Sequence, residues 1–227
     1  MKYLKMLSLA AIAAAALTAL VGVGSASAVT LCENNQATGC TSHVNSGATI
    51  DFSQHAASGS TPTIKLAGPL GIVLDTCTIS TVKGPTSNTG ADDTTTAVTG
   101  TITTLTFEGC TRKTTVIQTG TLETPGGAKD PSYGTLSITA SGTAGNGAVS
   151  SSNSTVVIHE LPEFFGNPET CAYKTSNTPL GTLTASATAG TFDINATITA
   201  ETENCPNGTW SGNYISTGPT VVKAIAH

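Results

Sequence analysis

Short runs of alternating apolar and polar residues recur along the chain and predict β-strands. The clearest run is 192–200, in which Phe, Ile and Ala alternate with Asp, Asn and Thr. The same period of two is found at residues 182–189 and 135–140. Because successive side chains of a strand point to opposite faces, each run is expected to bury one face and to expose the other to solvent.

A second kind of pattern is the continuous apolar run Gly71-Ile72-Val73-Leu74, which favours a central strand buried on both faces. Between the runs lie Gly-, Pro- and Asn-rich stretches that indicate turns, as at 124–134 and 141–154. No helical period interrupts them. We therefore expect an all-β fold, an antiparallel β-sandwich or jelly roll of about ten strands.

The first 28 residues have the pattern of a secretory leader. Lys2 and Lys5 precede an apolar stretch at 6–23, and small residues end at Ala28. We expect cleavage after Ala28, a secreted extracellular product and no membrane span in the mature chain. The alternative is a leader retained as an anchor, since its apolar stretch approaches membrane-spanning length.

All six cysteines lie after this leader, and an even number of cysteines in an exported chain indicates disulfides. Fifteen connectivities are possible for six cysteines. Spacing favours three local pairs that staple the fold, namely Cys32–Cys40, Cys77–Cys110 and Cys171–Cys205.

The mature chain divides by composition into a polar N-terminal segment at 29–60, which carries the short disulfide loop, and a β-sandwich domain at 61–227. An internal similarity suggests that this domain has two related halves, 61–130 and 131–227. The sequences VTGTIT and INATIT each precede a cysteine at a similar distance. Chance matches are easily produced in a chain rich in Thr, so both duplication and coincidence stay open.

Composition supports strands and removes one class of partner. Threonine, a poor helix former that suits strands, accounts for 42 residues after the leader. Only 10% of residues are charged, and fourteen Asp and Glu oppose nine Lys and Arg. Such a chain has no basic surface for phosphate backbones, so we expect no nucleic-acid partner.

A search for reactive constellations finds none that is complete. His159-Glu160 begins like a zinc-protease motif, but Glu163 stands where the second His is needed, directly after the helix-breaking Pro162. No GxSxG elbow exists, and Asp92-Asp93 lacks the pattern of a calcium loop. We expect no catalytic residue, no metal, no cofactor and no enzymatic activity.

Aromatic residues provide the one candidate for ligand contact. Trp210 and Tyr214 would share a face of a strand with Gly212 between them, and Tyr133 is a further candidate. Two rings spaced in this way suit stacking on sugars. The alternative, which we favour, is that Trp210 and Tyr214 fill the core beside the Cys171–Cys205 bridge.

The segments LTFEGCT, CAYKTSNTPLGTLTAS, FDINATI and WSGNY resemble a group of secreted, Thr- and Gly-rich proteins of actinobacteria. The resemblance extends roughly from Cys77 to the C-terminus. It implies export and a β-rich fold. The function of that group is unknown, so the resemblance assigns no catalytic residue to this chain.

These observations favour a secreted, non-enzymatic structural or interaction protein of the cell envelope or extracellular matrix. One variant is self-association, in which residues 220–226 pair as a terminal strand with a neighbouring copy. The alternative is a carbohydrate- or glycan-binding β-sandwich module that uses Trp210, Tyr214 and Tyr133 against a cell-surface glycan.

Overall fold

The structure is a computed structural model, and its fold consists almost entirely of antiparallel strands. The structure describes residues 29–33, 40, 42–54, 64–68, 71–88, 97–123, 127–141, 143, 145–161, 170–186, 189–218 and 223–226. Within these residues there is no α-helix. The predicted all-β, antiparallel and disulfide-stapled fold is therefore confirmed.

The described residues form eighteen strands, more than the ten or so expected, because many are only four residues long and too short for alternation to be recognised. In chain order they are β1 (Val29–Cys32), β2 (Thr49–Gln54), β3 (Ile64–Ala67), β4 (Val73–Cys77), β5 (Ile79–Pro85), β6 (Val98–Thr101), β7 (Thr104–Glu108), β8 (Thr114–Ile117), β9 (Gly120–Glu123), β10 (Lys129–Ser132), β11 (Thr135–Ala140), β12 (Gly147–Ser152), β13 (Thr155–Ile158), β14 (Cys171–Lys174), β15 (Thr178–Thr184), β16 (Thr191–Ala200), β17 (Gly208–Gly218) and β18 (Lys223–Ala226).

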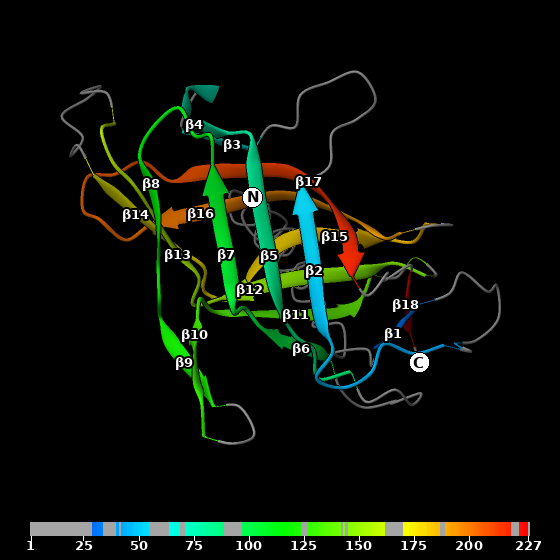
Figure 1. The fold of residues 1–227 in the computed structure, drawn as a ribbon. Helices are drawn as coiled ribbons and strands as arrows, with labels where there is room; N and C mark the ends of the chain where they lie inside the picture. Colours follow the sequence, from blue (N-terminus) through cyan, green and yellow to red (C-terminus); the bar gives the residue numbers. More distant parts are fainter. Residues whose placement is uncertain are drawn as a thin grey trace, which may run out of the picture.

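One curled sheet contains most of these strands. Its main path runs β6-β11-β12-β15-β16-β17-β2-β5-β7, while β3, β4, β8, β13 and β14 pair along its sides. The group β2, β5 and β7 crosses in front of β11, β12, β15, β16 and β17, so that the sheet folds over itself into two layers (Figure 1). The inner faces of both layers then enclose a common core.

The curl is completed where β5 approaches β6. The amide of Ser87 donates to the carbonyl of Thr99 at 2.7 Å, and the amide of Thr103 donates to the carbonyl of Lys83 at 2.8 Å. Gly84 lies between these bonds, and a Cβ there would collide with the carbonyl of Thr101. Glycine is thus required for the two backbones to lie so close.

Two adjoining clusters of buried side chains make up the core. The larger contains Phe52, Phe192 and Tyr214, and the smaller contains Tyr173 and Ile198. Strand β16 contributes to both clusters. Its inward positions alternate with exposed ones along nearly its whole length. The alternation predicted for this run is confirmed.

The N-terminal segment is part of this body. Strand β2 lies between β17 and β5 in the main sheet, and all four residues of β1 are buried. Buried Asn88 accepts a hydrogen bond from the amide of Leu31 at 3.0 Å and donates to the carbonyls of Leu31 and Val44. Strand β2, which lies within the expected segment 29–60, is thus hydrogen-bonded into the sheet that strands of the expected domain 61–227 build.

The C-terminal strand β18 pairs with β1 of the same chain, in antiparallel register from Val29 with Ala226 to Cys32 with Lys223. Ala224 is fully buried. Of the expected terminal strand 220–226, the part from 223 onward is thus already paired within the chain.

All three predicted disulfides are confirmed as Cys32–Cys40, Cys77–Cys110 and Cys171–Cys205. The first bridges β1 to the segment after it. The second joins the end of β4 to the turn after β7, and the third joins the start of β14 to the turn after β16.

The expectation for the apolar run at 71–74 is wrong in part. Leu74 is buried, but Ile72 is 37% exposed and Val73 is 46% exposed. Strand β4 lies at the margin of the sheet and pairs with β3 alone among the described strands, and the two exposed residues stand at its start and just before it. The two similar hexapeptides also differ in setting, since VTGTIT crosses the end of β6 whereas INATIT lies inside β16.

Candidate functional site

Trp210 is the residue on which the aromatic candidate site depends. It lies on β17 where that strand has β16 on one side, opposite Ala196, and β3 on the other, opposite Leu66. The ring is partly buried, packs against both core clusters and meets Phe107 edge to face, with centroids 5.8 Å apart. This is the core packing that we favoured from the sequence.

Tyr214 has no exposed surface at all, with 0% of it accessible. Its ring packs against Phe192, and its Oη donates a 3.0 Å hydrogen bond to Ser80 Oγ. Burial raises the pKa of its phenol, and the bond to Ser80 opposes that rise. Tyr214 thus lies in the core, as we favoured from the sequence, because the inward positions of β17 face the core, and its buried ring is not accessible for stacking on a surface glycan.

Tyr133 is half-buried and lies apart from this pair in the chain, in the turn between β10 and β11. Its side chain packs against the larger core cluster, and its amide donates to the carbonyl of Ile102 at 2.8 Å. No interaction joins it to Trp210 or Tyr214 within the described residues. The three candidate aromatics therefore do not form one platform.

Two adjoining hollows lie against Trp210 inside the fold. Their volumes are about 30 Å³ and about 50 Å³, and both are lined by Val156, Tyr173, Ile198 and Trp210. Tyr173, only 2% exposed, was not singled out from the sequence. Its Oη and the Nε1 of Trp210 are buried and have no hydrogen-bond partner among the described residues. Burial raises the pKa of Tyr173 to about 12.

The larger hollow also touches a buried carboxylate that sequence reasoning missed. Asp75 Oδ1 accepts hydrogen bonds from the amides of Thr76 and Arg112 and from Thr111 Oγ1, and its Oδ2 accepts one from Thr114 Oγ1. Four donors compensate the cost of burying this charge. The one available signal was an acidic residue directly after the apolar run and two positions before Cys77.

Asp75 also lies near the two sulfurs of the Cys77–Cys110 pair, within 4.8 Å. Both sulfurs are consumed in the disulfide and have no thiolate with which to bind a metal. In this oxidised form the group is a structural one.

His159 follows directly after the end of β13. Its Nε2 lies 3.1 Å from Thr115 Oγ1, and its Nδ1 lies 3.5 Å from Thr170 Oγ1. Hydroxyl neighbours hold the ring in place without an acidic partner among the described residues. Glu163 and the Asp92-Asp93 pair lie outside those residues.

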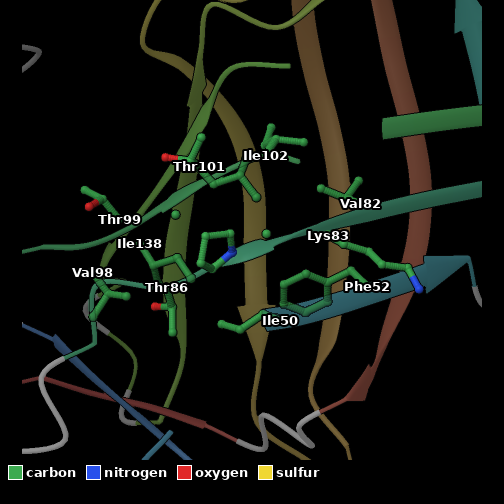
Figure 2. Close-up of a pocket in the computed structure, with 14 residues that line it drawn as sticks. Ile50, Phe52, Val82, Lys83, Thr86, Val98, Thr99, Thr101, Ile102 and Ile138 are labelled. Atoms are coloured by element: carbon green, nitrogen blue, oxygen red, sulfur yellow. The ribbon is translucent and has the colours of Figure 1, made fainter. Parts of the chain in front are cut away.

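A third hollow, of about 30 Å³, lies at the closure of the curl between β2 and β5 on one side and β6 and β11 on the other. Figure 2 shows Ile50, Phe52 and Ile138 around it, while the Lys83 side chain points away. The Lys83 ammonium pairs instead with Asp51 at 2.6 Å. This hollow has apolar walls without an unpaired polar group, and it is a packing gap of the closure.

Comparison with known proteins adds no family to this picture. No protein-family model, curated protein sequence or solved structure matches the chain. None of the described residues belongs to a helix long and apolar enough to cross a membrane. The leader at 1–28 lies outside the described residues, so its cleavage stays a prediction, as does the resemblance to the actinobacterial group.

Proposed function

We propose that this chain is an exported, non-enzymatic interaction protein of the cell envelope or extracellular matrix. The observation that supports this most is the outer surface of the layer formed by β11, β12, β15, β16 and β17, which we name the hydroxyl face. It comprises the outward positions of β11, β12, β15, β16 and β17. Most of them carry Thr, Ser or Asn: Thr135, Ser137, Thr139, Ser150, Ser152, Thr182, Thr184, Thr191, Asn195, Thr197, Thr199, Thr209, Ser211, Asn213 and Thr217.

Cross-strand register aligns these side chains in rows. Thr197 lies opposite Thr209, and Asn195 lies opposite Ser211. Among the residues of these five strands, Asp193 alone carries a charge. A broad, nearly uncharged surface of short donors and acceptors suits contact with another hydrated, hydroxyl-rich polymer, in which many weak hydrogen bonds act together.

Two further observations support this proposal. The polar groups that are buried are largely engaged in holding the fold: Asp75 joins β4 to the start of β8 and the segment before it, and Ser151 bonds to both Ser154 and Thr175 at 3.0 Å. Three disulfides are also expected of a protein that matures in an oxidising compartment.

The glycan-binding alternative is supported by a different part of the molecule than the sequence suggested. Tyr214 is buried and unable to stack on a sugar, whereas the hydroxyl face is accessible. Envelope glycan is accordingly the partner to test first.

Export is tested by the mass of the protein recovered from the culture medium and from the envelope of the producing cells. We expect a chain that begins at Val29 and carries three disulfides. A species that retains Met1 and sediments with membranes would overturn the extracellular assignment.

The role of the hydroxyl face is tested by sedimentation with insoluble, protein-free envelope glycan from the same cells. In the double variant Thr197→Lys, Asn213→Lys, two exposed positions of this face are blocked. We expect the affinity to fall about tenfold, since each lost hydrogen bond is worth about 0.5–1.5 kcal/mol.

The matched control is Thr115→Lys, Thr121→Lys, which adds the same charge on β8 and β9 at exposed positions. Its affinity should equal that of the wild type. Equal binding by the two double variants, or no binding by the wild type, would contradict the proposal.

A further inference from the structure

The hairpin of β9 and β10 carries an inference that does not depend on the proposed function. Among the described strands, these two pair only with each other and form a sheet of their own. The hairpin extends away from the two layers of the body (Figure 1). Of its strand residues only Ser132, at its base, is buried, and most of the others are exposed. The hairpin therefore adds little to the core.

Hydrogen bonds fix this hairpin to the body at its base. The amide of Thr119 donates to the carbonyl of Ser132 at 2.8 Å and closes the base. The amide of the next residue, Tyr133, donates to the carbonyl of Ile102 at 2.8 Å and joins the base to the body. Beyond this point the two strands have only each other as strand partners in the described part of the chain.

At the far end of the hairpin an ion pair joins the two strands. The Lys129 ammonium lies 3.7 Å from the Glu123 carboxylate, and the two side chains are 64% and 76% exposed. Ion pairs that are this exposed contribute little to stability, and a two-stranded hairpin by itself is only marginally stable in water. We therefore expect the hairpin to open locally while the rest of the fold stays intact.

The position of Lys129 sets it apart from the other basic residues. Six more Lys and Arg follow the leader, and the structure describes all of them. Four lie on strands that pair within the body, namely Lys65 on β3, Lys83 on β5, Lys174 on β14 and Lys223 on β18. Cutting beside any of these four requires a strand of the body to detach.

The remaining two basic residues, Arg112 and Lys113, lie in the turn between β7 and β8 and are held by hydrogen bonds. The Arg112 guanidinium donates to the carbonyls of Leu74 and Glu160. The carbonyl of Lys113 accepts a hydrogen bond from the amide of His159 at 2.9 Å. A trypsin-like protease must free the backbone and take the basic side chain into its own pocket, so this turn is a poorer substrate than the hairpin.

A cut after Lys129 would divide the chain into residues 29–129 and 130–227. Each disulfide lies within one of these segments, so no covalent bond would join them. Beyond the hairpin itself, five strand pairs cross from one segment to the other: β1 with β18, β2 with β17, β3 with β17, β6 with β11, and β8 with β13. The two segments are thus interleaved in one sheet.

The core also belongs to both segments. The ring of Phe52 packs against that of Phe192, with centroids 5.7 Å apart, and Tyr214 Oη donates to Ser80 Oγ at 3.0 Å. Separation of the segments would expose this buried apolar surface to water and break these contacts. Burial should therefore hold the segments together after a cut in the hairpin.

We propose that the β9–β10 hairpin is a processing site for proteases that cleave after basic residues, with Lys129–Asp130 as the bond that is cut. Hydrolysis breaks the C–N bond of this peptide. Water supplies the hydroxyl that leaves a carboxylate on Lys129 and the proton that completes the new amino group of Asp130. The product is one folded body made of two chains.

Limited digestion of the secreted protein with trypsin, with the disulfides intact, tests this proposal. Mass spectrometry should identify a single first cut, between Lys129 and Asp130. The two segments should then elute together in size-exclusion chromatography under native conditions. In denaturant they should separate without any reductant, because no disulfide joins them.

The variant Lys129→Gln should lose this first cut. Lys113→Gln is the matched control, because it removes an exposed Lys from the turn before β8, and it should be cut after Lys129 at the rate of the wild type. The proposal is overturned by a first cut at another residue, by a wild type that trypsin leaves intact, by an unchanged cut in Lys129→Gln, or by segments that separate without denaturant. None of these results bears on binding by the hydroxyl face.

Discussion

Tyr214 Oη donates a 3.0 Å hydrogen bond to Ser80 Oγ, and the two residues are 134 positions apart in the chain. The bond joins β17 to β5, which are separated in the sheet by β2. Both residues are almost completely buried, at 0% and 1% exposure. A polar link of this kind inside the core connects the end of the long strand to the layer that crosses it.

The variant Tyr214→Phe should lower the free energy of unfolding by about 1–2 kcal/mol, because it leaves the buried hydroxyl of Ser80 without its donor. Tyr173→Phe is the matched comparison, since the Tyr173 hydroxyl makes no hydrogen bond to a described residue. Its stability should equal or exceed that of the wild type. Denaturant unfolding with the disulfides intact measures both, and equal losses in the two variants would contradict this account.

Trp210→Ala should lower the free energy of unfolding by about 3 kcal/mol, through lost burial and a residual cavity. Trp210 contacts both core clusters and Phe107, so its loss removes packing from both clusters. Thr209→Ala, at the exposed neighbouring position, should stay within about 0.5 kcal/mol. A thermal midpoint unchanged in Trp210→Ala would exclude a core role for this ring.

Asp75→Asn should destabilise the fold by about 2–4 kcal/mol. An amide in place of this carboxylate turns one acceptor oxygen into an NH₂ group that faces donors, either Thr114 Oγ1 or the amides of Thr76 and Arg112. Asp193→Asn, on the exposed face of β16, removes the same charge and should have little effect. Denaturant midpoints of the two variants decide the point, and similar values would show that the Asp75 hydrogen bonds contribute little.

Stability should decline at alkaline pH. Burial raises the pKa of Tyr173 from 10.0 to about 12. The unfolded chain releases this proton near pH 10 whereas the folded chain keeps it, so unfolding releases protons and is favoured as the pH rises from 10 to 12. Unfolding free energies measured across that range should show a shallower decline in Tyr173→Phe than in Tyr133→Phe. The same slope in both variants would contradict a buried, late-titrating phenol.

Three features show which parts of the fold could be predicted from the sequence. The period of two in β16 and the spacing of the cysteines predicted a strand and three bridges, because both depend on residues close together in the chain. The run at 71–74 was misplaced, since its composition indicates apolar side chains but not whether a second layer covers them. Val73 remains 46% exposed at the margin of the sheet.

The candidate site, too, was predicted from the sequence only in part. Sequence alone placed Trp210 and Tyr214 on one face of one strand, and the structure agrees that both side chains lie on the inward side of β17. Which layer would cover that face was decided by pairings between distant strands, and these also brought Tyr173 to Trp210 around a common hollow. No local pattern marked Tyr173, and the acidic residue next to the apolar run was the one sign of Asp75, because the roles of both arise from neighbours that only the folded chain provides.

The sequence by itself therefore determined the strand class, the alternation of faces and the local disulfide pairs, all of which follow from the geometry of nearby residues. The tertiary structure alone decided the curl of the sheet, the inclusion of β1 and β2 in the body, and the partners of its buried polar groups. The physical reason is that hydrogen bonds and burial across the curl join residues tens of positions apart. Their strength depends on how the two layers meet rather than on the order of residues in either one.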